Sequence, residues 1–172
     1  SEATERKLLV DCGARMLERS GQTPQGWLSP WISESRLTPD LLVETGYRYT
    51  LNWCHDDQPV AMHTRSGQRL WSIPYPQELN DIPMIIARQM DAKDFAQMII
   101  DQFDEMLVQS RDQALVMGIA LHPYIVGQPY RLRHLRRALA HIEAARHQVH
   151  EGTGVWITTP GAICREVDKV MP

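Results

Sequence analysis

The sequence predicts an α/β fold, a parallel layer or barrel wall built of βα units. Helical stripes of apolar residues with a 3.6-residue period alternate along the chain with short segments of strand character. The continuous apolar run Ala114–Leu121 has the length of a strand that is covered on both faces. The chain has 172 residues, fewer than the roughly 200 that a complete eight-stranded barrel needs.

Five segments are predicted to be helices from their apolar spacing and their end signals. The segment 92–109 follows the helical period most closely, and Pro39 and Gly46 mark the first turn and the end of the second helix. The predicted helices cover about 4–20, 38–45, 92–109, 131–146 and the segment from Pro160.

About five segments are predicted to be strands. The first begins at Gly26 and opens into a loop, the second alternates apolar and polar residues, and the third follows a predicted turn at Ser66–Gly67. These candidates are 26–31, 47–53, 69–73, 114–121 and 154–158.

Composition predicts one domain over residues 1–172. Hydrophobic residues make up 43% and charged residues 23%, enough for a packed core.

The net charge of −3 gives no general attraction to phosphate, so no nucleic acid is expected as a partner. The basic face Arg131–Arg137 is either a phosphate contact or a solvated outer face. No signal pattern or run of about 20 apolar residues is present, so we expect a cytoplasmic protein without a membrane partner.

His122 is the first candidate catalytic residue. It follows a predicted buried strand, and reactive groups of parallel α/β folds lie just beyond the carboxyl ends of strands. An imidazole held there can exchange a proton near neutral pH. The alternative is a histidine that only closes a strand through a backbone hydrogen bond.

Asp56 and Asp57 are candidates for a carboxylate that tunes His122, because a nearby carboxylate fixes the tautomer of an imidazole. The alternative is a solvated turn.

Aromatic side chains near the same loops are predicted either to wall a small apolar pocket or to pack at the rim of the sheet. They are Trp27, Trp31, Trp53 and Tyr124.

No metal site is predicted in this chain. Cys12, Cys54 and Cys164 lie far apart without a CxxC spacing, so free thiols are expected. The His134–His141 and His147–His150 spacings lack accompanying ligands. Motifs of phosphate-binding loops, serine hydrolases and zinc proteases are absent from the sequence.

An ordered set of motifs resembles the polysaccharide deacetylase (NodB-like, carbohydrate esterase 4) superfamily, in the branch with allantoinase-like and peptidoglycan-deacetylase-like proteins. The resemblance covers nearly the whole chain and matches the later part of the family's domain. Its motifs are Thr23–Pro30, Gly46–Tyr47 with Asp56–Pro59, Leu79–Asp81, and Leu121–Pro123 followed by Gly127–Arg131.

The resemblance implies a partial distorted (β/α) barrel and a metal-dependent hydrolase that cleaves a non-peptide carbon–nitrogen (amide) bond. It implies that His122 is the general acid, tuned by Asp56 or Asp57. The segment with Trp27 and Pro30 resembles the family's substrate pocket. Trp53, Leu121 and Pro123 are the further residues expected to bind substrate.

The family's metal ligands, an Asp and a His pair, and its Asp general base come from a part of the domain that the chain lacks. Zinc or another divalent metal is therefore expected only in a full-length member. The segment Leu28–Ser29–Pro30 also departs from the family, whose members often carry an Arg before that proline. Water has a pKa of about 15.7 and needs a cation to become a nucleophile at neutral pH, so we expect this chain to be inactive alone.

Two hypotheses follow for the chain. It is either the C-terminal portion of an amide hydrolase that acts on a small amide or an acetylated sugar in carbohydrate metabolism, or a catalytically dead short form that binds a ligand or a protein. An incomplete barrel exposes strand edges, so we also expect a homodimer or larger homo-oligomer.

Overall fold

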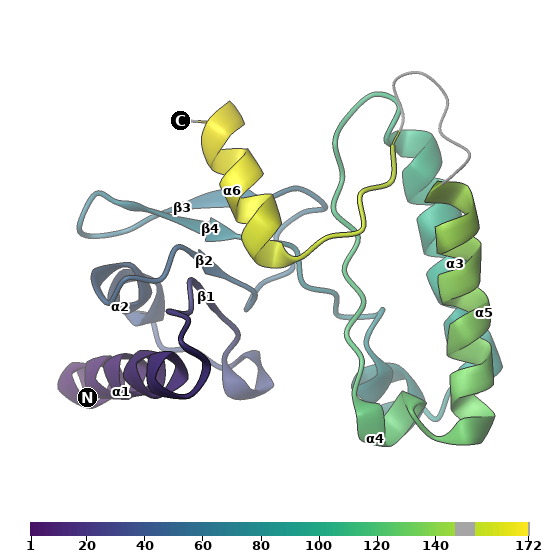
Figure 1. Ribbon diagram of the computed structural model, residues 1–172, viewed down its shortest axis with the longest axis horizontal. Helices are drawn as coiled ribbons and strands as arrows, with labels where there is room; N and C mark the ends of the chain where they lie inside the picture. Colours follow the sequence, from purple (N-terminus) through teal and green to yellow (C-terminus); the bar gives the residue numbers. More distant parts are fainter. Residues whose placement is uncertain (147–153, 172) are drawn as a thin grey trace. The chain divides into compact units, whose positions relative to one another are not determined.

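The computed structural model describes residues 1–146 and 154–171, and contacts within the chain divide it into two compact units (Figure 1). Unit 1 combines Ser1–Pro74 with Thr158–Pro172, and unit 2 is Tyr75–Ile157. The units are described separately below, and the single domain over 1–172 stays a prediction.

Unit 1 contains a four-stranded sheet in the order β1-β2-β4-β3. Strands β1 (Gly26–Trp27), β2 (Tyr49–Thr50) and β4 (Arg69–Ser72) are parallel, and β3 (Val60–His63) runs antiparallel to β4. Gly67, with a φ of 75°, closes the turn between β3 and β4 and donates its N–H to Thr64 O. The carboxyl ends of β1, β2 and β4 therefore meet at one edge of the sheet.

Helices cover both faces of this sheet (Figure 1). On one face, Leu70 of β4 packs with residues of α1 (Glu2–Ser20) and α2 (Thr38–Glu44). The next residue, Trp71, points to the opposite face and packs with Cys164 of α6 (Pro160–Val170). The short helix η1 (Pro30–Ile32) follows β1.

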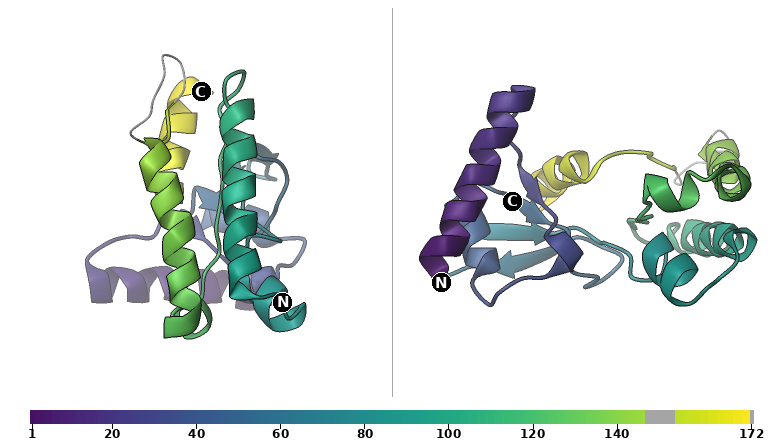
Figure 2. Two further views of the ribbon diagram at one scale, coloured as in Figure 1. Left: turned by 90° about the vertical axis from the view of Figure 1, so that its right-hand side faces the viewer. Right: turned by 90° about the horizontal axis from the view of Figure 1, so that it is seen from below.

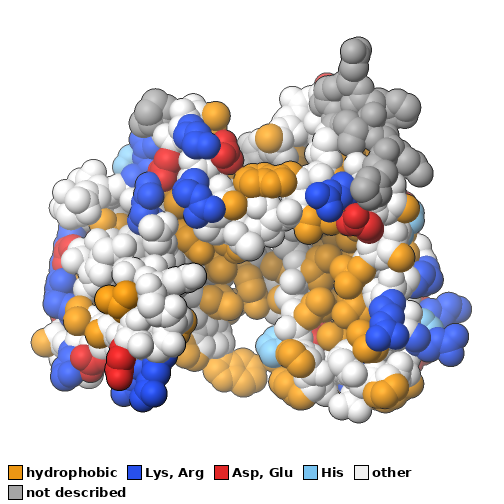
Figure 3. Space-filling model, viewed as in Figure 1, with side chains coloured by type: hydrophobic (Ala, Val, Ile, Leu, Met, Phe, Trp, Pro, Cys, Tyr) orange, Lys and Arg blue, Asp and Glu red, His pale blue; other side chains and the backbone are white. Residues whose placement is uncertain are grey.

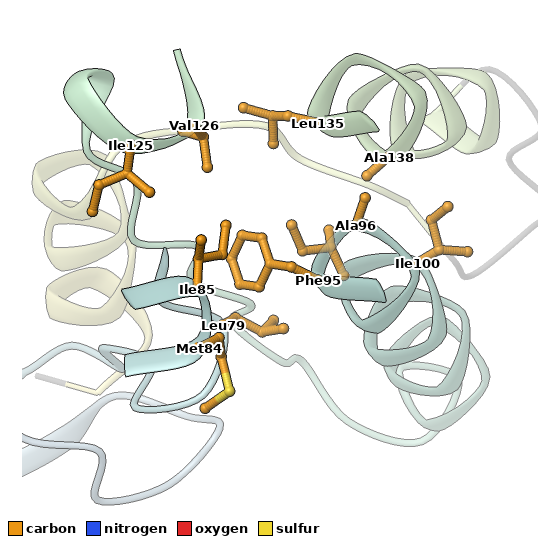
Figure 4. Packing of buried hydrophobic residues seen from close by; sticks show 11 residues of the cluster. Leu79, Met84, Ile85, Phe95, Ala96, Ile100, Ile125, Val126, Leu135 and Ala138 are labelled. Carbon is orange, nitrogen blue, oxygen red and sulfur yellow. The ribbon is translucent and has the colours of Figure 1, made fainter. Parts of the chain in front are cut away.

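Unit 2 is helical and has its own core. It contains η2 (Ile82–Ala87), α3 (Ala92–Gln109), α4 (Pro123–Val126) and α5 (Pro129–Arg146), and Figure 2 shows α3 and α5 side by side. In Figure 4 the Phe95 ring of α3 points toward Ile85 of η2, and Ala138 of α5 faces Ala96 of α3. Because both side chains are small, α3 and α5 approach closely at this contact.

The α/β class and the five predicted helices are confirmed. The helix predicted over 92–109 has those bounds, because its apolar stripe is the face that packs on α5 and η2. The predicted turn at Ser66–Gly67 is also present.

Two of the five predicted strands are wrong. In the segment 114–121 only Ala120 is bridged, to Asn80, and the described segment 154–158 has no strand; Trp156 and Ile157 are exposed there. A strand forms only where a neighbouring segment pairs with its backbone N–H and C=O groups, and apolar composition alone does not supply that neighbour. The sequence also missed β3, which forms because the turn at Gly67 folds it back onto β4.

Candidate active site

His122 and Asp81 form a close pair in unit 2. His122 Nδ1 lies 2.6 Å from Asp81 Oδ1, and the backbone N–H of His122 donates to Asp81 Oδ2 at 2.7 Å. The Asp81 side chain is fully buried, whereas 33% of the His122 side chain is exposed. One buried carboxylate thus holds both the ring and the backbone of a histidine that reaches solvent.

A short parallel bridge between two distant segments positions this pair. Asn80 is bridged to Ala120, with the Ala120 N–H donating to Leu79 O and the Asp81 N–H donating to Ala120 O. Asp81 and His122 come directly after the bridge on their two segments. The Asn80 side chain accepts the N–H of Ile82 at 3.2 Å and so fixes the start of η2.

The geometry determines which ring nitrogen is available for chemistry. A carboxylate only accepts hydrogen bonds, so the His122 tautomer that fits this contact carries its proton on Nδ1. Nε2 is then the atom that can exchange a proton with a ligand. This arrangement suits a general acid or base whose ring is oriented by a second residue.

The groups around the pair are tyrosines and core residues. The rings of His122 and Tyr124 meet edge to face, with centroids 5.8 Å apart. Burial raises the pKa of Tyr75, the negative charge of Asp81 raises it further, and a hydrogen bond with Asn80 lowers it. The Tyr75 phenol therefore stays neutral near pH 7.

Leu121 and Pro123, the neighbours of His122, were both predicted to bind substrate. Leu121 is half-buried and packs against the core of unit 2. Pro123 is exposed and occupies the first turn of α4, where its missing N–H costs no hydrogen bond. Their roles in binding stay predictions.

A buried hydrogen-bond network lies at the carboxyl ends of β1 and β2 in unit 1. The Ser29 N–H donates to Asn52 Oδ1 at 2.8 Å, and Asn52 Nδ2 donates to Ser29 Oγ at 2.9 Å and to Glu34 Oε2 at 2.7 Å. Trp27 Nε1 donates to the same Ser29 hydroxyl at 2.8 Å. The network ties the loop after β1 to the loop after β2.

Two predicted site tryptophans border this network. Trp53 Nε1 donates to Glu34 Oε1 at 2.8 Å. The Trp53 indole also stacks on the His55 ring, with the ring centroids 5.4 Å apart and an angle of 5° between the ring planes. Trp31 of η1 is 83% exposed and has a φ of 56°, and Ile32 follows with a φ of 49°. A β-branched residue rarely adopts a positive φ, so the backbone of η1 is strained.

The other predicted residues of unit 1 are at the surface. Pro30 is exposed at the start of η1. Asp56 and Asp57 are both exposed, and Asp56 Oδ1 accepts the N–H of Asp57 at 2.7 Å. The carboxylate that binds His122 in the structure is Asp81, and a role of Asp56 or Asp57 toward His122 stays a prediction.

Sequence reasoning gave no role to Asp81, although its motif was noted. The signal was available: Asp81 is the single charged residue in the apolar stretch 79–87, and a carboxylate in such a stretch is buried only with a partner. Ser29, Asn52 and Glu34 were also missed, because their network depends on the pairing of two strands.

The residues that the structure describes do not fit the divalent metal that the resemblance implies. Across 1–146 and 154–171, no group of three or more His, Cys, Asp or Glu side chains could hold a metal ion. The predicted spacing His147–His150 lies outside the described residues.

Lys and Arg side chains gather along the edge of unit 2 formed by α5 (Figure 3). Arg137 donates to Gln97 Oε1 at 2.8 Å, and Arg131 donates to Ile125 O at 3.4 Å. Two of the arginines of this basic face thus bind groups within unit 2. The helices of the described residues are all too short or too polar to span a lipid bilayer.

Comparisons with known proteins give relatives in sequence and in fold. No family model matches the sequence. A peptidoglycan deacetylase from Helicobacter pylori is 25% identical over an alignment 186 positions long, which covers 90% of this chain and 60% of that protein. Among solved structures, Puue allantoinase matches with a TM-score of 0.87 and 26% identity, over 100% of this chain and 55% of that one.

A probable polysaccharide deacetylase from Pseudomonas aeruginosa PAO1 has the same fold, with a TM-score of 0.86 and 24% identity, over 100% of this chain and 55% of that one. The chain thus spans less than two thirds of the length of each of these relatives. The fold and the Asp81–His122 pair define an α/β protein whose candidate site holds a histidine oriented by a buried aspartate. The resemblance to the NodB-like polysaccharide deacetylase superfamily is confirmed by these similarities.

Proposed function

We propose that the chain is part of an enzyme that hydrolyses a non-peptide carbon–nitrogen bond of an amide, with His122 as the general acid. The observation that supports this proposal is the Asp81–His122 pair, in which a fully buried carboxylate orients a ring whose Nε2 is left for proton transfer. The relatives in sequence and fold include a peptidoglycan deacetylase and an allantoinase. The substrate class is then a small amide or an acetylated sugar.

In the proposed reaction, the oxygen of water bonds to the acyl carbon, the water gives up one proton to a base that the full-length protein supplies outside the described residues, and the carbon–nitrogen bond breaks. Protonated His122 gives its Nε2 proton to the leaving nitrogen, which departs as an amine, while Nδ1 keeps its hydrogen bond to Asp81. The ring ends the step neutral. Asp81 is a positioning residue, since it acts through His122 and not on the substrate.

The described residues provide proton transfer but no means of activating water. We therefore propose that this chain alone does not turn over substrate, and that zinc or another divalent metal acts only in a full-length protein. Zinc analysis and an amide-hydrolysis assay of the isolated chain test this. Stoichiometric zinc together with turnover would contradict it.

The role of His122 is tested in the protein with its complete coding sequence, using deacetylation of chitin oligosaccharides and hydrolysis of allantoin. We expect His122→Ala to lower kcat by about 100-fold to 10,000-fold, the usual contribution of a general acid. His141→Ala is the matched control, because His141 also pairs with an aspartate at 2.6 Å, but on the exposed sides of α5 and α3. Equal activity of the His122→Ala variant and the wild type would overturn the proposal.

A second candidate is a catalytically inactive form that binds a ligand or a protein. It is favoured by the large exposed surface of Trp31 on a strained turn. Quenching of tryptophan fluorescence by a chitin oligosaccharide, lost in Trp31→Ala and unaccompanied by hydrolysis in the full-length protein, would support it.

A further inference from the structure

We propose that Tyr124 forms the leaving-group side of the substrate site and that the leaving amine it contacts belongs to a sugar ring. This inference rests on the proposed function of His122 and adds to it a residue that determines specificity. The observations that carry it are the ring contact with His122, the anchoring of α4 and the exposure of the Tyr124 ring.

The short helix α4 is fastened directly to His122. The carbonyl oxygen of His122 accepts the N–H of Ile125 at 2.9 Å and the N–H of Val126 at 3.2 Å. Ile125 and Val126 are buried in the core of unit 2. Tyr124 therefore has a fixed backbone, although 67% of the residue is exposed to solvent.

The position of Tyr124 relative to the acid follows from these contacts. Asp81 occupies the Nδ1 side of His122 and is fully buried, so the substrate approaches the ring from the solvent side. Tyr124 is itself exposed to solvent and contacts the His122 ring, with the two ring centroids 5.8 Å apart, so we place it beside this approach. A leaving nitrogen that takes the proton from Nε2 carries its substituent past the phenol ring.

The chemistry of Tyr124 suits a saturated ring with hydroxyl groups. A tyrosine offers an apolar face for the C–H groups of a sugar and a hydroxyl that donates or accepts hydrogen bonds. Two χ angles make the ordering of this side chain inexpensive in entropy. A small amide without a hydroxylated saturated ring, such as allantoin, offers fewer of these contacts to the phenol.

Tyr130 is the matched control. It is a second tyrosine of unit 2 with 63% exposure, at the start of α5. Its ring lies under the Arg131 guanidinium, at 5.1 Å, rather than against His122. The two tyrosines thus differ mainly in their neighbour.

The test is an NMR titration of the isotope-labelled chain with glucosamine trimer, which is the amine product of chitin-oligosaccharide deacetylation. We expect the ring signals of Tyr124 and His122 to shift together. Tyr124→Ala is expected to weaken binding about tenfold, a loss of roughly 1.4 kcal/mol, while Tyr130→Ala leaves it unchanged. Tyr124→Phe should restore most of the affinity, because the ring face remains.

Three results would overturn the inference: no shift at Tyr124, a shift at Tyr130 instead, or a Tyr124→Ala variant that binds the trimer as tightly as the wild type. The kinetics of the full-length protein separate this failure from failure of the proposed function. Activity that needs His122 but is indifferent to Tyr124 refutes only the role of Tyr124. Activity that does not need His122 refutes the proposed function itself.

Discussion

Asp81 binds His122 through both of its carboxylate oxygens, one to the ring Nδ1 and one to the backbone N–H. The two residues come together because Asn80 and Ala120 are bridged, 40 positions apart in the sequence. The carboxylate therefore has a structural role, in joining two segments of unit 2, and an orienting role for the imidazole.

We expect Asp81→Ala to destabilise the chain by about 1.5–3 kcal/mol, the usual cost of losing a hydrogen bond to a charged group. The variant leaves the His122 N–H without its partner, and the His122 ring loses its fixed tautomer. Urea unfolding measures the first effect and ¹⁵N NMR of the ring measures the second. Asp104→Ala is the control, since its exposed pair with His141 should contribute less than about 1 kcal/mol.

Gly26 of β1 lies directly beneath the ring of Tyr49 on β2. A Cβ at this position would come within 2.0 Å of Tyr49 Cζ. We expect Gly26→Ala to destabilise the chain by about 1–3 kcal/mol, because the Tyr49 ring has to move out of a packed position. Thermal unfolding measures the loss. Gly154→Ala should be close to neutral, as no atom of the described residues beyond its chain neighbours lies within 4 Å of a Cβ there.

Amphipathic helices were predictable from the sequence, and so was the position of His122 after the segment 114–121. The helix over 92–109 needs only one apolar face, which the order of residues determines locally. A strand needs a neighbour. The run 114–121 has the composition of a strand, but its one bridge is made by Ala120 to Asn80.

The site was predictable only in part for the same reason. His122 could be chosen from its place after an apolar run, whereas its partner Asp81 depends on a bridge that no local pattern specifies. The network of Ser29, Asn52 and Glu34 likewise requires the pairing of β1 with β2. Residue type and spacing indicate which side chain can act in catalysis, but the residue that it pairs with is determined by the fold.

The stability of unit 1 should fall in acid because of Glu44. Hydrogen bonds from Arg65 and Arg6 lower the pKa of this carboxyl from 4.5 to about 2. A carboxyl with a lowered pKa in the folded state stabilises the fold above its unfolded pKa, and this contribution is lost as the pH falls from 4.5 to about 2. The urea midpoint of the wild type should therefore drop more over this range than that of Glu44→Gln.

Salt and a second variant check this interpretation. The groups are exposed, so high salt should reduce the difference between wild type and Glu44→Gln. Glu105→Gln is the control, because Glu105 accepts a hydrogen bond from the neutral side chain of Gln109. If the urea midpoints of the wild type and of Glu44→Gln fall equally in acid, the contacts of Glu44 with Arg65 and Arg6 do not contribute to the loss of stability at low pH.

The sheet edge at β1 leads to a prediction about association. In the sheet order β1-β2-β4-β3, β1 pairs with β2 on one side and with no other strand of the described residues. Leu28 and Trp31 follow it and are exposed at 45% and 83%. Proteins rarely leave an edge strand with adjacent apolar surface uncovered, so we expect two copies of the chain to associate through this edge.

Light scattering should then give twice the chain mass of 19.8 kDa at working concentration. Leu28→Lys should shift the equilibrium toward the monomer, because a lysine at this edge would have to be desolvated in the dimer. Ile86→Lys is the control, since Ile86 is similarly exposed but belongs to unit 2. A wild-type chain that stays monomeric would contradict the prediction, and so would a dimer that Leu28→Lys leaves intact, because the contact would then lie elsewhere.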